Sequence, residues 1–398
     1  MNIIDSNGEK IMPEKKKHHY VPKFYLKEFA NDKGEFAIFN LKDEKCIEAV
    51  PYKDQCYKAY FYGKDGVWEE RLGEMETKWS GVFRKIKEKD VLLEEDLKLI
   101  KQFAVYQRHR TFAENEYVKQ GRVDMVIECG KMLYANKGWF FDEEAERICR
   151  NRALNETAPA ENLEAAINLS KYLDDLNVLV INYNTSGELI SSDVPVVAIN
   201  PFHQFTIGYA CMGVIFFFPI SRHQLVVIYD SKMYSRFRDR QYMDMEDESE
   251  VCNLNAFQYV SAETILFSYR TDELNSFSDG VKEARDKCRK KSAISTLGPD
   301  QNKLIFGGMR LTLYDCELSF GQLSHQYRRI PFTCREAVPR KWEAEWERKL
   351  NSKEQVIMAF MRDDPKMMAD SGLTKKDLKL GYRRMASVAK NYWNLQKD

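Results

Sequence analysis

The sequence has little of what marks a secreted or zinc-stabilised protein. Its nine cysteines include no Cys-x-x-Cys pair, and none lies within a few residues of a histidine. This spacing argues against a zinc ribbon or finger. An odd number of cysteines in a long chain also argues against a disulfide scaffold. We therefore expect reduced thiols and a cytoplasmic protein.

Long apolar runs are also absent. The longest, Met212 to Ile220, contains Gly213 and Pro219 and is roughly half as long as a membrane span. The first residues, 1–17, are polar and carry no apolar stretch of the kind found in a secretory signal. The sequence predicts a flexible polar leader over residues 1–17 and no contact with a membrane.

The third absence is an excess of charge of one sign, because 61 Lys and Arg balance 61 Asp and Glu. A surface that binds phosphates must then be a local patch. Residues 366–398 form such a patch, with eight Lys and Arg against three Asp, a net charge of +5. We expect this tail to be an exposed helical appendage that binds nucleic acid electrostatically. The basic residues concerned are Lys375, Lys376, Lys379, Arg383 and Arg384.

The periodicity of apolar residues predicts an α+β fold. Strand-like runs fill residues 178–231, and helical patterns lie before and after them. We expect a central, mainly antiparallel or mixed sheet from this region and later strands, packed by N-terminal and C-terminal helices. Continuous apolar runs such as Ile215 to Phe218 indicate strands covered on both faces.

The chain is expected to hold one α+β domain over residues 18–320 and a C-terminal helical extension over residues 321–398. The helices of the extension are candidates for contact with a second copy or a partner protein. Two local predictions accompany this division. Glu35 to Leu41 is expected to pair as a strand with Cys46 to Val50. Residues 239–250, with six acids against one arginine, are expected to form a solvated loop.

Two of the six histidines, His18 and His19, stand together before a short predicted helix. Adjacent residues of an extended segment point to opposite sides. One histidine would therefore act at a site, as base or metal ligand, while the other holds the segment. The alternative is that the pair only caps the helix. In both cases Phe24, Tyr25 and Phe29 are too apolar for exposure, and we expect them to pack against the strands between residues 178 and 231.

Two other segments carry polar residues at inward positions. The helix that begins near residue 94 has an apolar stripe that turns polar at Gln107 and Arg110. An inward arginine requires a phosphate, a carboxylate or several carbonyl groups, so Arg110 either meets a ligand or forms a buried salt bridge. Asp193 follows a strand and precedes Pro195. This is a common position for a catalytic carboxylate, and equally for an Asp that accepts bonds from neighbouring N–H groups.

Together these segments resemble a large, mostly bacterial family with a domain of unknown function, whose members open with His-His-Tyr-x-Pro-x-x-Tyr-Leu. The resemblance covers roughly residues 17–270. The supporting motifs, in chain order, are Gln107 with Arg110-Thr111, Ser192-Asp193-x-Pro195, Phe218-Pro219-Ile220-Ser221, and Asn255 with Ala262. Phe112 and Arg222 depart from it, since members often have proline there. Residues assigned a structural role in the motifs are Tyr20, Pro22, Tyr25, Ser192, Pro195 and Asn255.

The resemblance implies no established reaction, but some relatives are encoded in anti-phage defence loci. We expect five residues to converge in one polar pocket as catalytic candidates: His18, His19, Gln107, Arg110 and Asp193. A histidine, a carboxylate and an arginine are the parts that a phosphodiesterase requires. The first hypothesis is a defence nuclease that uses a divalent metal ion. The second is a non-catalytic sensor or binding module, in which the same residues form a ligand pocket or a buried scaffold.

Overall fold

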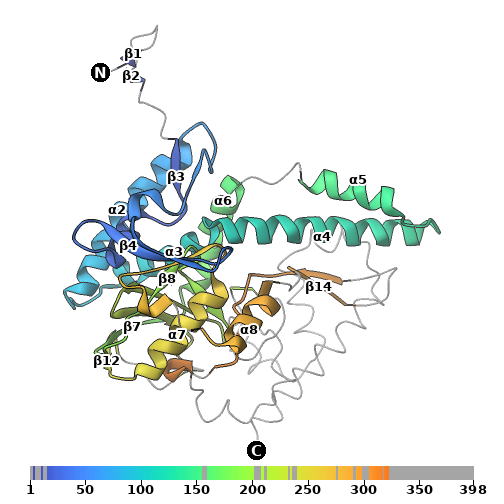
Figure 1. Ribbon diagram of the computed structural model, residues 1–398. Helices are drawn as coiled ribbons and strands as arrows, with labels where there is room; N and C mark the ends of the chain where they lie inside the picture. The colour runs from blue at the N-terminus through green and yellow to red at the C-terminus, as the bar shows by residue number, and fades with distance from the viewer. Residues whose placement is uncertain are drawn as a thin grey trace, which may run out of the picture.

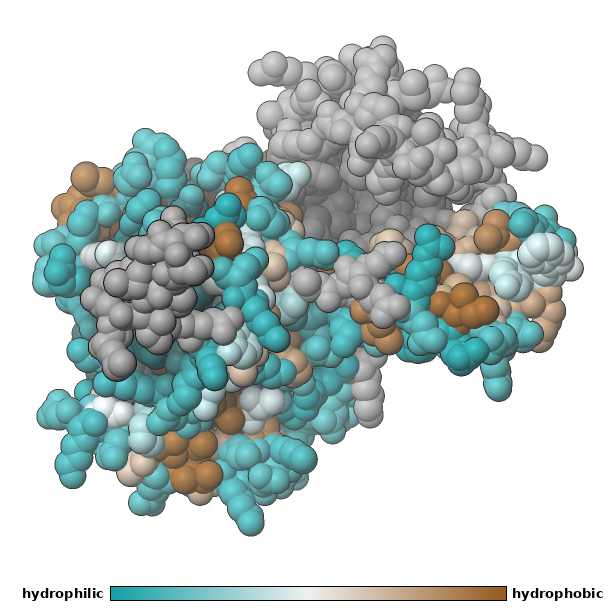
Figure 2. All heavy atoms as spheres, turned by 90° about the horizontal axis from the view of Figure 1, so that it is seen from above, coloured by the Kyte–Doolittle hydropathy of each residue, from teal (hydrophilic) through white to brown (hydrophobic). Residues whose placement is uncertain are grey.

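The computed structural model describes residues 3–4, 10–11, 16–154, 159–200, 208–209, 213–231, 234, 240–274, 277–289, 293–297, 304–316 and 318–321. Two sheets and the helices around them form one body, and a pair of helices projects from it (Figure 1). The surface is largely hydrophilic, with apolar side chains also gathered on the projecting pair (Figure 2). The α+β class predicted from the sequence is confirmed.

The main sheet has five strands in the order β12-β7-β11-β10-β9. Their bounds are β7 Asn177–Tyr183, β9 Val197–Ile199, β10 Ile215–Ser221, β11 Gln224–Tyr229 and β12 Tyr242–Met245. β12 runs parallel to β7, whereas the other neighbours are antiparallel. The sheet is therefore mixed, and most of it comes from the region that the sequence indicates.

Both faces of this sheet are covered, which explains the continuous apolar runs. On β10, Phe216 and Phe218 belong to the larger core cluster, while Ile215 and Phe217 belong to the cluster on the other face. The larger cluster contains residues of four helices from the N-terminal half: α1 (Lys23–Leu26), α2 (Val67–Lys87), α3 (Glu94–His109) and α6 (Pro159–Leu169). The opposite cluster contains residues of α7 (Glu248–Ser261). Helices from both halves thus enclose the sheet, as predicted.

A second, antiparallel sheet has the order β5-β4-β13-β8. Its strands are β4 Glu35–Asn40, β5 Lys45–Pro51, β8 Ser191–Ser192 and β13 Ile265–Ser268. The predicted pairing of residues 35–41 with 46–50 is confirmed by β4 and β5. Because β8 is only two residues long, Asp193 lies directly at the end of this sheet.

The prediction of a solvated loop over residues 239–250 is wrong. This segment contains β12 and the start of α7. Its acids serve the backbone: Asp247 accepts from the N–H groups of Ser249 and Glu250 at the start of α7, and the Glu248 carboxylate accepts from the N–H of Ser186 at 2.7 Å. Acidic residues at a helix start satisfy N–H groups that the helix leaves unpaired.

The remaining elements are shorter or peripheral. The helices are α1 Lys23–Leu26, α4 Phe112–Asn136, α5 Glu143–Leu154 and α8 Asp279–Arg289, and the strands are β1 Ile3–Ile4, β2 Lys10–Ile11, β3 Lys17–His19, β6 Tyr57–Ala59, β14 Ile294–Leu297 and β15 Leu304–Gly307. No helix in the described part of the chain is both long enough and apolar enough to span a membrane. The basic tail, with Lys375, Lys376, Lys379, Arg383 and Arg384, lies outside the described residues.

The N-terminal segment packs as predicted. Tyr25 and Phe29 are fully buried, and Phe24 contacts Phe83 and Phe103 with ring centroids 5.5 and 6.2 Å apart. Phe103 in turn contacts Phe218 on β10 at 5.3 Å. The short first helix is therefore held by the aromatic core beside the main sheet rather than by its own hydrogen bonds.

Candidate functional site

The histidine pair lies on β3, which pairs with β6, and both rings are buried. The Nδ1 atom of His18 accepts from the N–H of Tyr62 at 3.2 Å, and its ring stacks on Tyr62. The Nε2 atom of His19 lies 3.0 Å from the Lys53 carbonyl oxygen. Since a carbonyl only accepts, Nε2 carries the proton. Burial lowers the pKa of His19, and the hydrogen bond to the Lys53 carbonyl group opposes that change.

Arg110, directly after α3, is also fully buried. Its Nη2 donates to the His19 carbonyl oxygen at 2.6 Å, and its Nη1 lies 2.8 Å from a carboxylate oxygen of Glu76. The Tyr62 hydroxyl donates to the Arg110 carbonyl oxygen at 3.1 Å. Arg110 and the histidine segment therefore meet, but through the backbone of His19 rather than around an open space.

The neighbours of Arg110 hold other segments in the same way. Gln107 donates to the Tyr20 carbonyl oxygen at 2.9 Å. Arg108 donates to the carbonyl oxygens of Val196 and Arg310 and lies 3.5 Å from the Glu114 carboxylate. The end of α3 thus fixes three remote stretches of backbone with buried side chains.

Asp193 is buried and accepts three hydrogen bonds from the turn between α7 and β13. Its Oδ1 accepts from the N–H of Glu263 at 2.9 Å. Its Oδ2 accepts from the N–H and the hydroxyl of Thr264 at 2.7 and 2.6 Å. Burial raises the pKa of Asp193, and the hydrogen bonds from Thr264 and Glu263 oppose that rise. The carboxylate acts as a cap for this turn.

Helix α7 reinforces the same region. Asn255 accepts from the N–H of Ile190 at 3.0 Å and donates to the Glu188 carbonyl oxygen at 2.9 Å. Gln258 accepts from the Ser192 hydroxyl at 2.8 Å and donates to the Pro195 carbonyl oxygen at 2.8 Å. Asn255 is therefore an internal hydrogen-bond hub, which agrees with a structural role for this motif residue.

The first helix begins at Pro22, whose carbonyl oxygen accepts from the N–H groups of Tyr25 and Leu26 at 3.0 Å. The Tyr25 hydroxyl donates to the Pro219 carbonyl oxygen and lies 2.9 Å from the Ser191 hydroxyl oxygen. We call the buried polar residues of these segments the buried scaffold: His18, His19, Tyr25, Gln107, Arg108, Arg110, Ser192, Asp193 and Asn255.

Of the expected site residues, Gln107 and Arg110 meet the histidine segment through its backbone, whereas Asp193 binds the turn between α7 and β13. Burial, and then the nearby Asp193 carboxylate, raises the pKa of the Cys56 thiol, and the Cys56 carbonyl oxygen accepts from the N–H of Tyr20. Within the described part of the chain, no group of three or more His, Cys, Asp and Glu side chains is placed to hold a metal ion.

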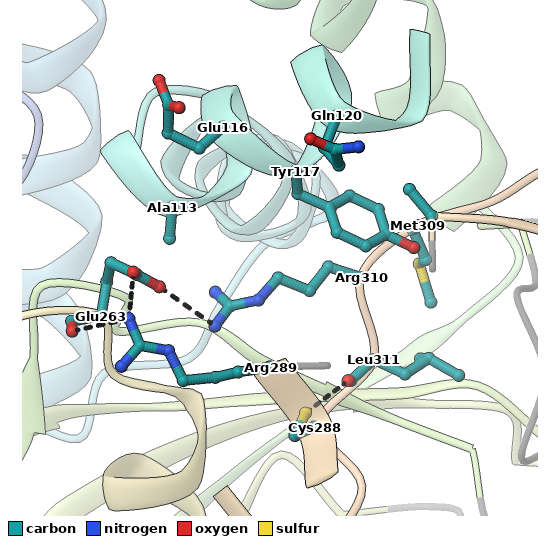
Figure 3. A pocket seen from close by; sticks show the side chains of 11 residues that line it. Ala113, Glu116, Tyr117, Gln120, Glu263, Cys288, Arg289, Met309, Arg310 and Leu311 are labelled. Atoms are coloured by element: carbon teal, nitrogen blue, oxygen red, sulfur yellow. Dashed lines mark hydrogen bonds and ion pairs between the residues drawn. The ribbon is translucent and has the colours of Figure 1, made fainter. Parts of the chain in front are cut away.

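A cavity of about 200 Å³ lies on the other side of the α7–β13 turn. Its lining comes from α4, this turn, α8 and the segment after β15, and includes Ala113, Glu116, Tyr117, Gln120, Glu263, Cys288, Arg289, Ala293, Met309, Arg310 and Leu311. Figure 3 shows Arg289 and Arg310 turned toward Glu263, with Tyr117 facing Met309. We call this space the arginine cavity.

The charges in the arginine cavity are unevenly matched. Glu263 pairs with Arg289 through Oε1, and its Oε2 lies 3.9 Å from Arg310. Glu116 lies 3.9 Å from Lys119. The Nη1 atom of Arg310 is buried and has no hydrogen-bond partner among the described residues. One carboxylate therefore serves two guanidinium groups.

The buried scaffold builds the walls of the arginine cavity. Asp193 holds the N–H of Glu263, and Arg108 holds the carbonyl oxygen of Arg310. The side chain of Arg310 also donates to the Ser261 carbonyl oxygen at 2.8 Å. Residues of the sequence motifs thus hold the backbone of Glu263 and Arg310, and in this way they position the charged side chains of the cavity.

The family model described as a protein of unknown function, DUF4238, matches residues 17–272. The chain belongs to the DUF4238 family. The DUF4238 match contains the whole buried scaffold and the α4 and Glu263 walls of the arginine cavity, whereas Arg289 and Arg310 lie beyond it. Neither the curated proteins nor the solved structures contain a match to the chain.

The sequence patterns do not indicate Glu263, Arg289 or Arg310. Arg289 belongs to a helix rich in charge, a pattern typical of a solvated face. Arg310 follows a strand without a recognisable motif. Asp193 is the one residue in the sequence that points to the cavity. An Asp that accepts hydrogen bonds from a turn fixes the geometry of that turn, and here the turn carries Glu263.

Proposed function

We propose that this DUF4238 protein is a binding module and that its arginine cavity receives a small ligand carrying a phosphate group. The observation that carries the proposal is the pair Arg289 and Arg310, which share the single carboxylate of Glu263 while Arg310 retains a buried nitrogen without a described partner.

A phosphate group suits this arrangement. A guanidinium group binds phosphate or carboxylate oxygens through two parallel hydrogen bonds. Arg289 and Arg310 carry two positive charges and Glu263 carries one negative charge, so the three side chains leave one positive charge for an anionic ligand. A third arginine, Arg285, holds the turn itself by donating to the carbonyl oxygens of Ala262 and Glu263 at 3.3 and 3.1 Å.

The remaining walls limit the size of the ligand. Ala113, Met309 and Leu311 offer an apolar side, and Tyr117 and Gln120 offer hydrogen bonds. The volume of about 200 Å³ is below the range of roughly 300–1,000 Å³ typical of drug-sized ligands. The cavity therefore suits a phosphate with a small body, or the terminal phosphate of a longer molecule such as an oligonucleotide.

The proposal favours the binding-module hypothesis over the nuclease hypothesis, because the catalytic candidates are buried and bonded to the backbone. Nuclease action by His18, His19, Gln107, Arg110 and Asp193, a divalent metal ion and a place in anti-phage defence stay predictions. A degradation assay on DNA and RNA with Mg²⁺ or Mn²⁺ tests them. Cleavage lost in a folded His19→Ala variant supports the nuclease. The binding module predicts no cleavage and a less stable variant.

Calorimetric titration of the full chain tests the binding proposal. The probes are inorganic phosphate, adenosine monophosphate, and a short single-stranded oligonucleotide with and without a 5′-phosphate. Arg310→Met should weaken phosphate binding at least tenfold, since a charged hydrogen bond contributes about 1.5–3 kcal/mol. Glu263→Gln should strengthen it, because the competing carboxylate is removed.

Arg147→Met is the matched control, since Arg147 is exposed on α5 and does not line the cavity. A 5′-phosphate requirement on the oligonucleotide points to nucleic-acid ends, and equal binding of free phosphate and nucleotide points to a small metabolite. Absence of phosphate binding, or binding that Arg310→Met leaves unchanged, contradicts the proposal.

A further inference from the structure

Helices α4 and α5 form a hairpin that projects from the body (Figure 1), and we call it the arm. It has a small core of its own, made of Val123, Ile127 and Ala153 together with Val126, Phe141 and Cys149. Gly130 lies against Cys149, since a Cβ added there would come within 2.8 Å of its sulfur. These contacts define which side of each helix faces the other.

One outer face of the arm is apolar. On α4 the exposed residues Met125, Cys129 and Leu133 follow one another at intervals of four, so they form a row along the helix. Viewed along the axis of α4, this row lies about 100° around the helix from Gly130. On α5 the exposed Ile148 lies about 100° to one side of Cys149, and because α5 runs antiparallel this is the same side of the arm.

The opposite outer face carries charges instead. The residues there are Asp124, Glu128 and Lys131 on α4 and Glu146 and Arg150 on α5, with ion pairs Lys131–Glu128 at 2.7 Å and Arg150–Glu146 at 2.9 Å. A two-helix arm normally has both faces solvated and polar. Exposed fractions of 39% for Met125, 53% for Leu133 and 56% for Ile148 therefore indicate a surface with a partner.

The charges beside the apolar face favour a second copy as the partner. Glu144, which also pairs with the exposed Arg147 on its own helix at 2.6 Å, lies one turn before Ile148, and Arg152 lies one turn after it. When two α5 helices pack antiparallel and meet at Ile148, Glu144 of each lies opposite Arg152 of the other. This antiparallel pairing has a two-fold axis that passes near Ile148, perpendicular to the helices. Gly130 on α4 lies beside Cys149 on α5, so the axis also passes near Cys129, the middle of the α4 row. The surface is complementary to itself.

We propose that two copies of this chain associate through the apolar faces of their arms, as an antiparallel four-helix bundle with a two-fold axis near Cys129 and Ile148. Such a pairing is isologous, the commonest form of homodimer. It is independent of the arginine cavity, whose α4 residues Ala113, Glu116, Tyr117 and Gln120 lie toward the other side of the helix.

The available area suits a reversible dimer. The part of α4 beside α5, residues 123–136, and the 12 residues of α5 extend about 21 and 18 Å. With a width of about 10 Å per helix, they offer roughly 400 Å² per copy, or about 800 Å² in total, which is the size of a weak, transient interface. Trp139 and Phe140 at the tip, 57% and 85% exposed, add aromatic side chains that are frequent at binding hot spots.

Sedimentation velocity of the full chain, at concentrations from about 1 to 200 μM, tests the association. The wild type should change from monomer to dimer within this range. Leu133→Glu and Ile148→Glu should each weaken the dimer more than about a hundredfold, because a charge is buried without a partner. Lys131→Glu, on the charged face, is the control and should leave the dimer unchanged.

Two further measurements fix the geometry. A thiol-reactive bismaleimide with a short spacer should cross-link the dimer through Cys129, and Cys129→Ser should abolish the product. Glu144→Arg and Arg152→Glu should each weaken the dimer by about tenfold, and the double variant should restore it. A protein that is monomeric at every concentration overturns the proposal. The apolar face would then be covered by residues 322–398 or by another protein. A dimer that Leu133→Glu leaves intact also overturns the proposal. Circular dichroism verifies that each variant is folded.

Discussion

Arginine side chains occupy both the buried scaffold and the arginine cavity, and the contrast between Arg110 and Arg310 separates the two regions. Arg110 meets the Glu76 carboxylate and the His19 carbonyl oxygen. Arg310 meets the Ser261 carbonyl oxygen, but the carboxylate beside it, Glu263, lies 3.9 Å away and is shared with Arg289. Both regions hold buried side-chain atoms without a hydrogen-bond partner among the described residues, Arg108 Nε in the first and Arg310 Nη1 in the second. The difference between the regions is therefore one of charge: Arg110 has a carboxylate of its own, whereas two guanidinium groups of the cavity share one and leave a positive charge for a ligand.

The largest difference between the two regions should appear in the free energy of unfolding. Arg110→Met breaks a buried pair and leaves Glu76 and the His19 carbonyl group unmatched, so we expect a loss of about 3–5 kcal/mol. Arg289→Met removes a side chain that is 38% exposed and should cost at most about 1 kcal/mol. Urea denaturation of both variants measures the difference. Equal losses would remove the distinction between scaffold and cavity.

Asp193 should have the next largest effect. Asp193→Ala leaves the N–H groups of Glu263 and Thr264 without their acceptor, and each buried unsatisfied group costs about 1–3 kcal/mol. We expect a loss of about 3 kcal/mol in urea denaturation, and a smaller loss for Asp193→Asn, which keeps one acceptor oxygen. Because Glu263 is held by Asp193, phosphate affinity should fall with it. An Asp193→Ala variant of unchanged stability contradicts its role as a cap.

A buried histidine makes the free energy of unfolding depend on pH, and His109 is the example here. His109 is buried beside Tyr209, and burial lowers its pKa to about 4 from an ordinary value of about 6.5. As the pH falls from about 6.5 to about 4, the unfolded chain takes up a proton that the folded chain does not. The histidine's contribution to stability is complete above this window and decreases by about 3 kcal/mol across it.

The measurement is the difference in unfolding free energy between the wild type and His109→Gln at several pH values. Burial raises the pKa of Asp193 and of Glu250, which acts in the opposite direction, but both groups are present in both proteins. The wild type should lose more stability on acidification than the variant. Parallel curves would mean that His109 is protonated in the folded protein.

Tyr25→Phe should have the smallest effect. The variant keeps the ring in the aromatic core and removes only the hydroxyl that donates to Pro219 and meets Ser191. A single buried neutral hydrogen bond contributes about 1 kcal/mol, and thermal unfolding should show a correspondingly small decrease in midpoint. A loss above about 3 kcal/mol would place Tyr25 at the centre of the scaffold rather than at its edge.

The sequence predicts what depends on local pattern. The alternation of residues 35–41 predicts β4, and the apolar run of residues 215–218 predicts a strand covered on both faces. The stripe that turns polar at Gln107 correctly indicates buried polar groups at the end of α3. In each case neighbouring residues in the chain contain the whole signal.

The elements that pattern alone misses depend on remote partners. β12 is a strand because it pairs with the edge of β7, and its acidic composition conceals this. α5 has only two buried residues, so its apolar period is weak. The arginine cavity brings together Glu263, Arg289 and Arg310 from separate segments, and no spacing in the sequence relates them.

During synthesis, the N-terminal aromatic segment emerges long before the residues that it packs against. Tyr25 leaves the ribosome 166 residues before Ser191 and 194 before Pro219, the partners of its hydroxyl group. At about 5–20 residues per second, the nascent chain carries an unfinished core for roughly 10–40 seconds. An apolar segment exposed for so long is a natural substrate for chaperones. The yield of folded protein should therefore respond to the rate of translation and to chaperone supply.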